Sequence, residues 1–242
     1  MKDLHSHLLY GIDDGSDDLE ESIKLLKEME KSGVEELILT PHYIENSKYN
    51  CNNDDKVELF NKFQERVEEE GINVTLYLGN EVYITDKFID LIKDNEIWTL
   101  NGSKYLLFEL PLRSLYKHTL EVCNELIANG YVPILAHPER YPILQDHPDM
   151  VEEYLRSGIL LQGNLTSLFG KYGKTAEKTL KLFLKNNWIS FLGSDTHHSV
   201  GFNEKKLRKK LLRITKDEDY VEDLLNNNFD KVINNEDMNI IR

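Results

Sequence analysis

Asp-Leu-His-Ser-His (residues 3–7) ends the first apolar stretch of the chain with two histidines. Six later segments also end an apolar run with side chains that bind metal ions well: Leu-Thr-Pro-His (39–42), Gly-Asn-Glu (79–81), Leu-Phe-Glu (107–109), Leu-Ala-His-Pro-Glu-Arg (135–140), Leu-Gln-Gly-Asn (161–164) and Gly-Ser-Asp-Thr-His (193–197). Side chains two positions apart on a strand point to the same side, so His5 and His7 can reach one ion. The recurrence of this pattern predicts that the segments converge on one site.

Apolar strands and amphipathic helices alternate along the chain. The pattern predicts strands over residues 2–5, 35–40, 73–79, 105–109, 133–136, 160–163 and 190–193. It predicts helices near 17–32, 55–70, 86–92, 115–129, 148–156, 173–186 and 203–226, and a small hairpin at Asn101-Gly102. For the first helix, Ser16 is the expected N-cap and Gly33 the expected stop. Such alternation is typical of a parallel sheet covered by helices.

Seven parallel strands can form an open doubly wound sheet or a closed barrel, and in both the functional groups lie at the carboxyl ends of the strands. An open sheet gathers its site at one switch point between a few strands. Here polar side chains follow every predicted strand, and only a closed barrel brings seven strand ends to one mouth. We therefore expect a β/α barrel. No fixed-period repeat and no Pro/Gly/Ser-rich linker divides the sequence, so residues 1–242 are expected to form one domain.

The chain is acidic, with 43 acidic and 29 basic residues among 242 and a formal net charge of −14. This charge argues against nucleic-acid binding, which needs a basic surface. No apolar run approaches the ~18 residues of a membrane span, and no signal peptide precedes the opening motif. The two cysteines, Cys51 and Cys123, form neither a metal-type pair nor a disulfide framework. The cytoplasm is therefore the expected location.

Five of the eight histidines follow predicted strands, and four carboxylates accompany them. The nine candidate metal ligands are His5, His7, Asp14, His42, Glu81, Glu109, His137, Asp195 and His197. Histidine and carboxylate together suit borderline divalent ions such as Mn, Fe or Zn. Glu109 ends an apolar run, and a buried carboxylate without a partner is costly, so we expect it to face a cation. The set predicts a metal centre.

In order and approximate spacing, the motifs Asp-x-His-x-His, Thr-Pro-His, Gly-x-Glu, Phe-Glu, His-Pro-Glu-Arg and Gly-Ser-Asp-x-His resemble those of the polymerase and histidinol phosphatase (PHP) superfamily. The opening stretch 3–15 and Ala-His-Pro-Glu-Arg-Tyr (136–141) are similar to one branch, the metal-dependent protein-tyrosine phosphatases of bacterial capsule and exopolysaccharide clusters. The resemblance extends from residue 3 to about residue 200. It implies a distorted, TIM-barrel-like (β/α)7 barrel of the PHP type with three divalent metal ions, often Mn²⁺.

By position, the resemblance distributes the candidate ligands over three ions. It implies that the first is held by His5, His7, Glu81 and Asp195, the second by Glu81, Glu109 and His137 with Glu81 bridging, and the third by Asp14, His42 and His197. The implied reaction is hydrolysis of phosphotyrosine by a metal-activated hydroxide, without a phosphoenzyme. The implied partner is a phosphotyrosine-containing protein, namely a tyrosine kinase that controls polysaccharide synthesis.

Arg140 is the guanidinium nearest to the motifs and the expected catalytic and substrate-binding residue, because it can hold a phosphate in a bidentate manner. Members of the family commonly carry a second arginine soon after Gly-Ser-Asp-x-His. Residues 197–203 contain none, and Arg208 falls on a predicted helix. Lys171 or Arg113 are the candidates to replace it.

Cysteine-based phosphatase chemistry is excluded by spacing, because it requires Cys-x5-Arg. The sixth residue after Cys51 is Val57, and the sixth after Cys123 is Asn129. Two other functions would use the same metal ligands. One is a small-molecule phosphatase of the histidinol-phosphate type, and the other is a non-catalytic PHP domain.

The polar loop 43–55 follows a candidate ligand. It is expected either to recognise the substrate, with Tyr43 or Tyr10 stacking on a phosphotyrosine ring, or to be an ordinary surface loop.

Overall fold

The computed structural model describes residues 1–112 and 116–238. Its strands are short and, within these residues, pair only in parallel. They are β1 (Lys2–Ser6), β2 (Glu36–Leu39), β3 (His42–Tyr43), β4 (Thr75–Leu78), β5 (Glu81–Tyr83), β6 (Tyr105–Glu109), β7 (Val132–Ala136), β8 (Leu160–Asn164) and β9 (Phe191–Gly193).

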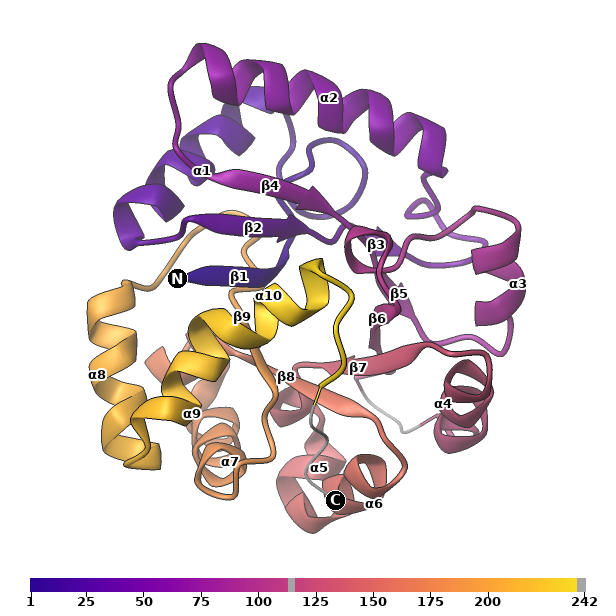
Figure 1. Cartoon of the computed structure of the whole chain (residues 1–242), viewed down its shortest axis with the longest axis vertical. Helices are drawn as coiled ribbons and strands as arrows, with labels where there is room; N and C mark the ends of the chain where they lie inside the picture. The colour runs from indigo at the N-terminus through magenta and orange to yellow at the C-terminus, as the bar shows by residue number, and fades with distance from the viewer. Residues whose placement is uncertain (113–115, 239–242) are drawn as a thin grey trace.

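The strands form the wall of a barrel (Figure 1). β1, β2 and β4 pair in that order, and β3, β5, β6, β7, β8 and β9 form the second sheet. β3 extends β2, and β5 extends β4, because the pair His42–Glu81 follows the pair Leu39–Leu78 along the same two neighbouring segments. The ring closes where the Asp195 N–H donates to the His5 carbonyl oxygen at 2.9 Å. With β2 and β3 counted as one strand, and β4 and β5 as another, the described strands form a distorted seven-stranded β/α barrel. This confirms the predicted fold class.

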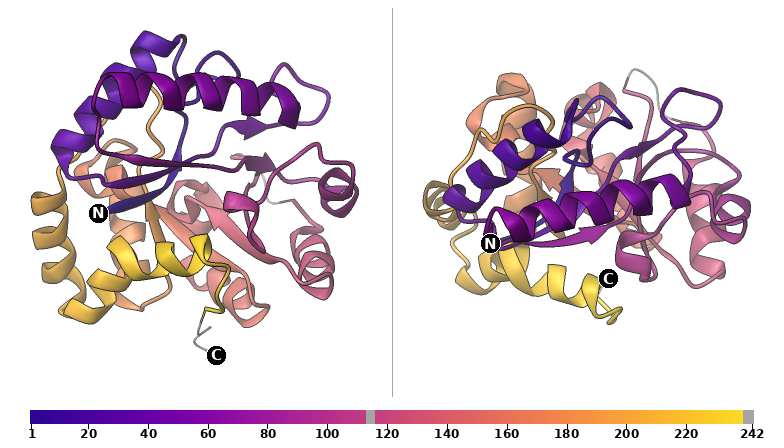
Figure 2. Two further views of the ribbon diagram at one scale, coloured as in Figure 1. Left: turned by 45° about the horizontal axis from the view of Figure 1, so that its top comes forward. Right: turned by 90° about the horizontal axis from the view of Figure 1, so that it is seen from above.

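Helices cover the outside of the barrel and one of its ends (Figures 1 and 2). The described α-helices are α1 (Leu19–Ser32), α2 (Asn53–Glu69), α3 (Phe88–Lys93), α4 (Thr119–Ala128), α5 (Pro142–Asp146), α6 (Val151–Arg156), α7 (Gly173–Lys185), α8 (Glu204–Thr215), α9 (Glu218–Glu222) and α10 (Asn228–Ile233). Phe229 and Val232 of α10 pack with Leu4, Tyr105 and Leu160 near the beginnings of their strands. α10 therefore covers the end of the barrel opposite to the candidate ligands.

Strand alternation leads from the apolar interior of the barrel to a polar mouth. Leu107 belongs to the interior cluster, and Glu109 follows two positions later on β6. Phe191 of β9 also belongs to that cluster, and Asp195 lies two residues beyond the end of this strand, where its left-handed backbone (φ 51°) interrupts the alternation. Because side chains alternate between the two faces of a strand, Glu109 points to the same side as Leu107 and lies nearer to the mouth.

Gly193 leaves room in this mouth. A Cβ atom at this position would lie 2.6 Å from the His5 Cβ and 2.9 Å from the Gln162 Nε2. No side chain fits at such distances, so the glycine lets His5 of β1 and Gln162 of β8 meet over β9.

Several local predictions are wrong in instructive ways. The predicted strands 35–40 and 73–79 are confirmed as β2 and β4, but the short strands β3 and β5 that follow them were not predicted. Pro41, which separates β2 from β3, has no N–H to continue the ladder. The predicted hairpin at Asn101-Gly102 is a single 3-10 turn over Leu100–Gly102, and β6 pairs with β5 and β7 instead. The first helix is capped by Asp18, whose side chain accepts from the Glu21 N–H, and not by Ser16.

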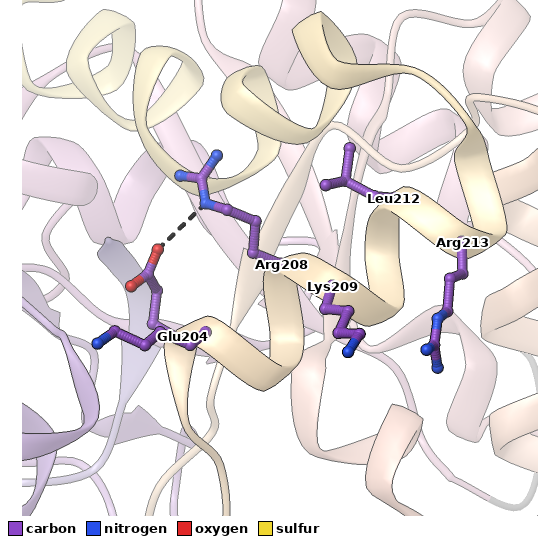
Figure 3. Close-up of a pocket in the computed structure, with 6 residues that line it drawn as sticks. Glu204, Arg208, Lys209, Leu212 and Arg213 are labelled. Atoms are coloured by element: carbon purple, nitrogen blue, oxygen red, sulfur yellow. Dashed lines mark hydrogen bonds and ion pairs between the residues drawn. The ribbon is translucent and has the colours of Figure 1, made fainter.

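The predicted helical segment 203–226 is divided into α8, α9 and a π-helical turn over Asp223–Asn227. Figure 3 shows the outer face of α8, where the Arg208 Nε donates to Glu204 at 3.2 Å. Arg208 also donates to Glu222 at 2.9 Å, so its guanidinium is engaged on the helix surface. Across the described residues, no helix is both long enough and apolar enough to cross a membrane.

Candidate metal centre

His5 and His7 face each other at the end of β1, with their Nε2 atoms 3.0 Å apart. The Nδ1 atom of each ring, on the side away from this contact, has a hydrogen-bond partner of its own. The His5 Nδ1 lies 2.9 Å from the Gln162 Oε1, and the His7 Nδ1 lies 2.8 Å from the Asp13 Oδ2. The amide of Gln162 is oriented by its Nε2, which donates to the Gly163 carbonyl oxygen. Because each Nδ1 can donate to an oxygen, the Nε2 atoms are the ring nitrogens directed into the mouth, where a deprotonated Nε2 can bind a metal ion.

Glu81, the first residue of β5, lies fully buried at the centre of the cluster. Its Oε2 lies 3.2 Å from the His5 Nε2 and 3.3 Å from the His7 Nε2. The same oxygen lies 3.1 Å from the His42 Nδ1, and the Oε1 lies 2.9 Å from the His137 Nε2. One carboxylate thus faces four imidazoles, which is the arrangement of a bridging ligand.

Glu109 and His137 follow β6 and β7 on the other side of Glu81. The Glu109 Oε1 lies 3.4 Å from the His42 Nδ1, and its Oε2 lies 3.9 Å from the His137 Nε2. Burial and the charge of Glu81 raise the pKa of Glu109 to about 9. Burial and the charge of Arg140 lower the pKa of His137 to about 4, so this imidazole is neutral, the form that binds metals.

Asp14, His42 and His197 form the outer part of the cluster. The Asp14 Oδ1 lies 3.5 Å from the Nε2 of both histidines. The hydrogen bond with His197 holds the pKa of Asp14 well below its usual range. Asp14 is the most exposed of the candidate ligands, with 53% of its side chain accessible. This part of the centre therefore lies closest to solvent.

Asp195 directs its two oxygens to different neighbours. The Oδ1 lies 3.4 Å from the His7 Nε2 and 3.7 Å from the His5 Nε2. The Oδ2 accepts from the Arg140 Nη1 at 2.7 Å. Asn164 and Tyr172 also donate to the Oδ2, at 2.8 Å and 3.2 Å. Arg140 is therefore joined to the cluster by its ion pair with Asp195.

All nine predicted ligands meet at this mouth, but their grouping differs in detail from the expected one. The ligand atoms of three groups lie within 4.8 Å of one another: His5, His7 and Glu81; His42, Glu81 and Glu109; and His7, Asp14, His42 and His197. His7 and His42 are each shared between two groups. The distribution of the ligands over particular ions therefore stays a prediction.

Four residues that orient the centre are missing from the sequence-based site. Asp13 holds His7 and also accepts from the His42 N–H at 2.9 Å. Gln162 holds His5, and Asn164 holds Asp195. Gln162 and Asn164 belong to the segment Leu-Gln-Gly-Asn (161–164), at the end of a predicted strand, so the sequence did indicate these two residues. Tyr172 belongs to none of the motifs, and no sequence signal pointed to it.

The predicted aromatic partners of the substrate are not both placed as expected. Tyr43 is buried and packs in the core, so it has no free face for a substrate ring. From the same loop, the Tyr49 ring lies near-parallel to His42, with 6.1 Å between ring centroids. Tyr10 is partly buried and packs against the core.

Of the two proposed substitutes for a second arginine, Lys171 lies close to the site. Its Nζ is 5.5 Å from the ring centroid of Tyr172, which contacts Asp195. Arg113 lies outside the described residues. Both cysteines are free, and burial raises the pKa of Cys123 to about 12.

The donor set fits divalent cations. The Glu81 Oε2 and the His42 Nδ1 are buried without a hydrogen-bond partner in the described part of the chain, although they lie only 3.1 Å apart. The His5 and His7 Nε2 atoms lie 3.0 Å apart, so without an ion they must share a proton, and a divalent cation would take the place of that proton. Unpaired buried polar atoms are rare and costly, and a bound metal ion satisfies all of them together.

Comparison with known proteins agrees with this geometry. The family model "Capsular polysaccharide synthesis, CpsB/CapC" matches residues 1–234. CapC of Staphylococcus aureus is 34% identical over 217 residues, which are 86% of this chain and 84% of that protein. The fold matches the crystal structures of YwqE from Bacillus subtilis and CpsB from Streptococcus pneumoniae, described as metal-dependent tyrosine phosphatases. That match has a TM-score of 0.90 and 26% identity, and it covers 98% of this chain and 96% of the other.

The histidinol phosphate phosphatase of Lactococcus lactis shares the barrel, with a TM-score of 0.58 at 15% identity over 89% of this chain and 92% of its own. This match concerns the fold alone and agrees with a PHP-type barrel. The chain therefore belongs to the CpsB/CapC family of capsular polysaccharide synthesis proteins.

Proposed function

We propose that this chain is a metal-dependent protein-tyrosine phosphatase, a phosphoric monoester hydrolase that acts on phosphotyrosine. The observation that carries this function is the convergence of nine histidine and carboxylate side chains around the buried Glu81, with Arg140 at their edge. The solved relatives described as metal-dependent tyrosine phosphatases support it. We further propose that the substrate is a tyrosine kinase of polysaccharide synthesis and that the reaction takes place in the cytoplasm.

Three divalent ions, with Mn²⁺ as the first choice and Fe or Zn as alternatives, are proposed to bind at the mouth. His5, His7 and Asp195 would hold the first ion together with Glu81. Glu81 would also contribute to the second ion, and the remaining ligands are Glu109 and His137 for the second ion and Asp14, His42 and His197 for the third. When bound, such ions lower the pKa of a water molecule and offset the charge that develops on a transferred phosphoryl group.

Arg140 is the proposed substrate-binding residue. One of its terminal nitrogens donates to Asp195, and its side chain is 21% accessible. A guanidinium has five donors in one plane, so Arg140 can keep this ion pair and still offer donors to phosphate oxygens. Its pairing with Asp195 fixes the guanidinium next to the cluster, where a phosphate on the metal ions would lie. Lys171 is the proposed second cation of the phosphate site.

A covalent cysteine route is not part of this function. Cys123 is fully buried, and its raised pKa keeps the thiol protonated. Burial also raises the pKa of Cys51. We therefore propose direct hydrolysis without a phosphoenzyme. The leaving phenolate has an ordinary pKa near ~10, so its departure makes little demand on a protonating residue.

Phosphate release from a phosphotyrosyl peptide and from histidinol phosphate, measured side by side, tests the proposal. Metal-stripped enzyme should be inactive and should recover with added Mn²⁺, Fe²⁺ or Zn²⁺. We expect the peptide to be the better substrate. Higher kcat/KM for histidinol phosphate would favour a small-molecule phosphatase with the same centre. Failure of every metal to restore activity on either substrate would favour a non-catalytic PHP domain.

A further inference from the structure

Tyr172 lies directly before α7 and reaches across to the metal centre from outside all of the motifs. Its hydroxyl oxygen lies 3.2 Å from the Asp195 Oδ2. Its ring lies against the guanidinium of Arg140, with the Arg140 Cζ 4.3 Å from the ring centroid. One side chain thus contacts both a proposed metal ligand and the proposed phosphate-binding residue.

The hydroxyl of Tyr172 acts on Asp195 as a donor. A carboxylate oxygen accepts only, so at 3.2 Å the phenol O–H is the donor of this pair. Asn164 is a second donor, and its amide is oriented because its Oδ1 accepts from the Thr166 N–H and hydroxyl at 3.0 Å and 2.7 Å. Arg140 is the third donor.

These three donors come from different parts of the fold and meet on one oxygen. With the Oδ2 engaged in this way, the carboxylate of Asp195 can turn only its Oδ1 toward His5 and His7. The donors therefore define how Asp195 presents itself to a metal ion.

The ring of Tyr172 acts on Arg140. A salt bridge through a single nitrogen leaves a guanidinium free to rotate about that contact. The aromatic face restricts this freedom, because the Arg140 Cζ lies over the ring at 4.3 Å from its centroid and a cation on a ring face is favourable. Arg140 is then fixed both at its Nη1 and over one face, and its free edge points in a defined direction.

We propose that Tyr172 is a positioning residue that aligns the metal ligand Asp195 through its hydroxyl and the phosphate-binding Arg140 through its ring. The proposal rests on the proposed function of the centre. The two roles belong to different atoms of one side chain, so two substitutions separate them. Tyr172→Phe removes the hydroxyl and keeps the ring, whereas Tyr172→Leu removes both.

The experiment measures Mn²⁺ binding to metal-stripped protein by equilibrium dialysis, and KM, kcat and inhibition by inorganic phosphate on metal-saturated enzyme. Tyr172→Phe should weaken the affected Mn²⁺ site by about 3- to 10-fold, less than the usual loss for an outer ligand partner because two donors remain. Its KM and its inhibition constant for phosphate should stay within about 2-fold of wild type. Tyr172→Leu should show the same loss of Mn²⁺ affinity and, in addition, raise the phosphate inhibition constant about 5- to 10-fold.

Tyr77→Phe is the matched control, because the Tyr77 hydroxyl also donates to a carboxylate, that of Glu36 at 2.8 Å, away from the metal centre. It should leave Mn²⁺ affinity and phosphate inhibition unchanged, whatever its effect on thermal stability. Wild-type Mn²⁺ affinity in Tyr172→Phe would overturn the role of the hydroxyl, and wild-type phosphate inhibition in Tyr172→Leu would overturn the role of the ring. A wild-type protein without phosphatase activity would instead refute the proposed function, and the dialysis would still test Tyr172.

Discussion

Replacing Arg140 by alanine tests how the chain binds the transferred phosphate. The Arg140 Nη1 lies 2.7 Å from the Asp195 Oδ2, which places the guanidinium beside the proposed ligands. A charge-assisted hydrogen bond contributes about 1.5–3 kcal/mol, and each ~1.4 kcal/mol corresponds to a factor of ten. Loss of one such bond to phosphate should lower kcat/KM by about 10- to 150-fold. Asp195 keeps its hydrogen bonds from Asn164 and Tyr172, so the metal ligands should stay in place.

The assay is steady-state hydrolysis of a phosphotyrosyl peptide at saturating Mn²⁺, with inhibition by inorganic phosphate measured on the same samples. In Arg140→Ala the inhibition constant of phosphate should rise together with the loss in kcat/KM, because the same contact is lost in both. Arg140→Lys should recover only part of this loss, since an ammonium lacks the planar fork.

Arg208→Ala is the control, because Arg208 is ion-paired to Glu204 and Glu222 on the surface of α8 (Figure 3). It should retain wild-type kinetics. If Arg140→Ala kept both kcat/KM and phosphate inhibition at wild-type values, Arg140 would be a structural partner of Asp195 and the reasoning about phosphate would be refuted.

Three further predictions concern the outer metal site, the cysteines and a buried lysine. His42→Ala and His197→Ala should each lower activity by at least ~100-fold, the effect of losing an electrostatic contributor, with a smaller effect on the melting temperature; near-native turnover would mean that the outer site is not catalytic. Chelators should abolish hydrolysis, while Cys51→Ser and Cys123→Ser should keep most of it, and a trapped phosphocysteine would overturn the mechanism. Burial lowers the pKa of Lys56 to about 8 from 10.5, so its charged form destabilises the fold below pH 8 and this cost disappears as the pH rises toward 10.5. Lys56→Met should therefore raise the melting temperature at pH 7 by more than at pH 10, and an equal or opposite change at the two pH values would contradict this assignment.

The sequence was sufficient to predict that the candidate metal ligands meet, because most of them lie at or just after the end of an apolar strand; Asp14, in the loop after β1, is the exception. Glu109 is the clearest case, since the predicted strand 105–109 coincides with β6 and the interior position of Leu107 determines where Glu109 points. His5 and His7 lie two positions apart and direct their Nε2 atoms to one place, although Leu4 belongs to the interior cluster and the strand pairing shifts between Asp3 and Ser6. The prediction that residues 1–242 form one domain is not tested by these features and stays a prediction.

Other features depend on neighbours that are distant in sequence. Strands β3 and β5 are two and three residues long, too short to show a period. Within β3, His42 faces the mouth and Tyr43 packs in the core, so Tyr49, and not Tyr43, is the aromatic residue of this loop whose ring lies beside His42. Tyr172 is recognisable only when Arg140 and Asp195 are brought together in space, because its own surroundings in the sequence carry no motif.

The most direct test of the central claim is an anomalous difference map from crystals of the Mn²⁺-loaded protein. We expect at least two ions within about 4 Å of each other, the usual spacing in two-metal sites, with Glu81 between them and a further ion near Asp14, His42 and His197. Histidine and carboxylate ligands to each ion would confirm the assignment of the mouth of the barrel as the metal centre. A map without peaks at Glu81, or with ions bound only elsewhere on the acidic surface, would contradict it.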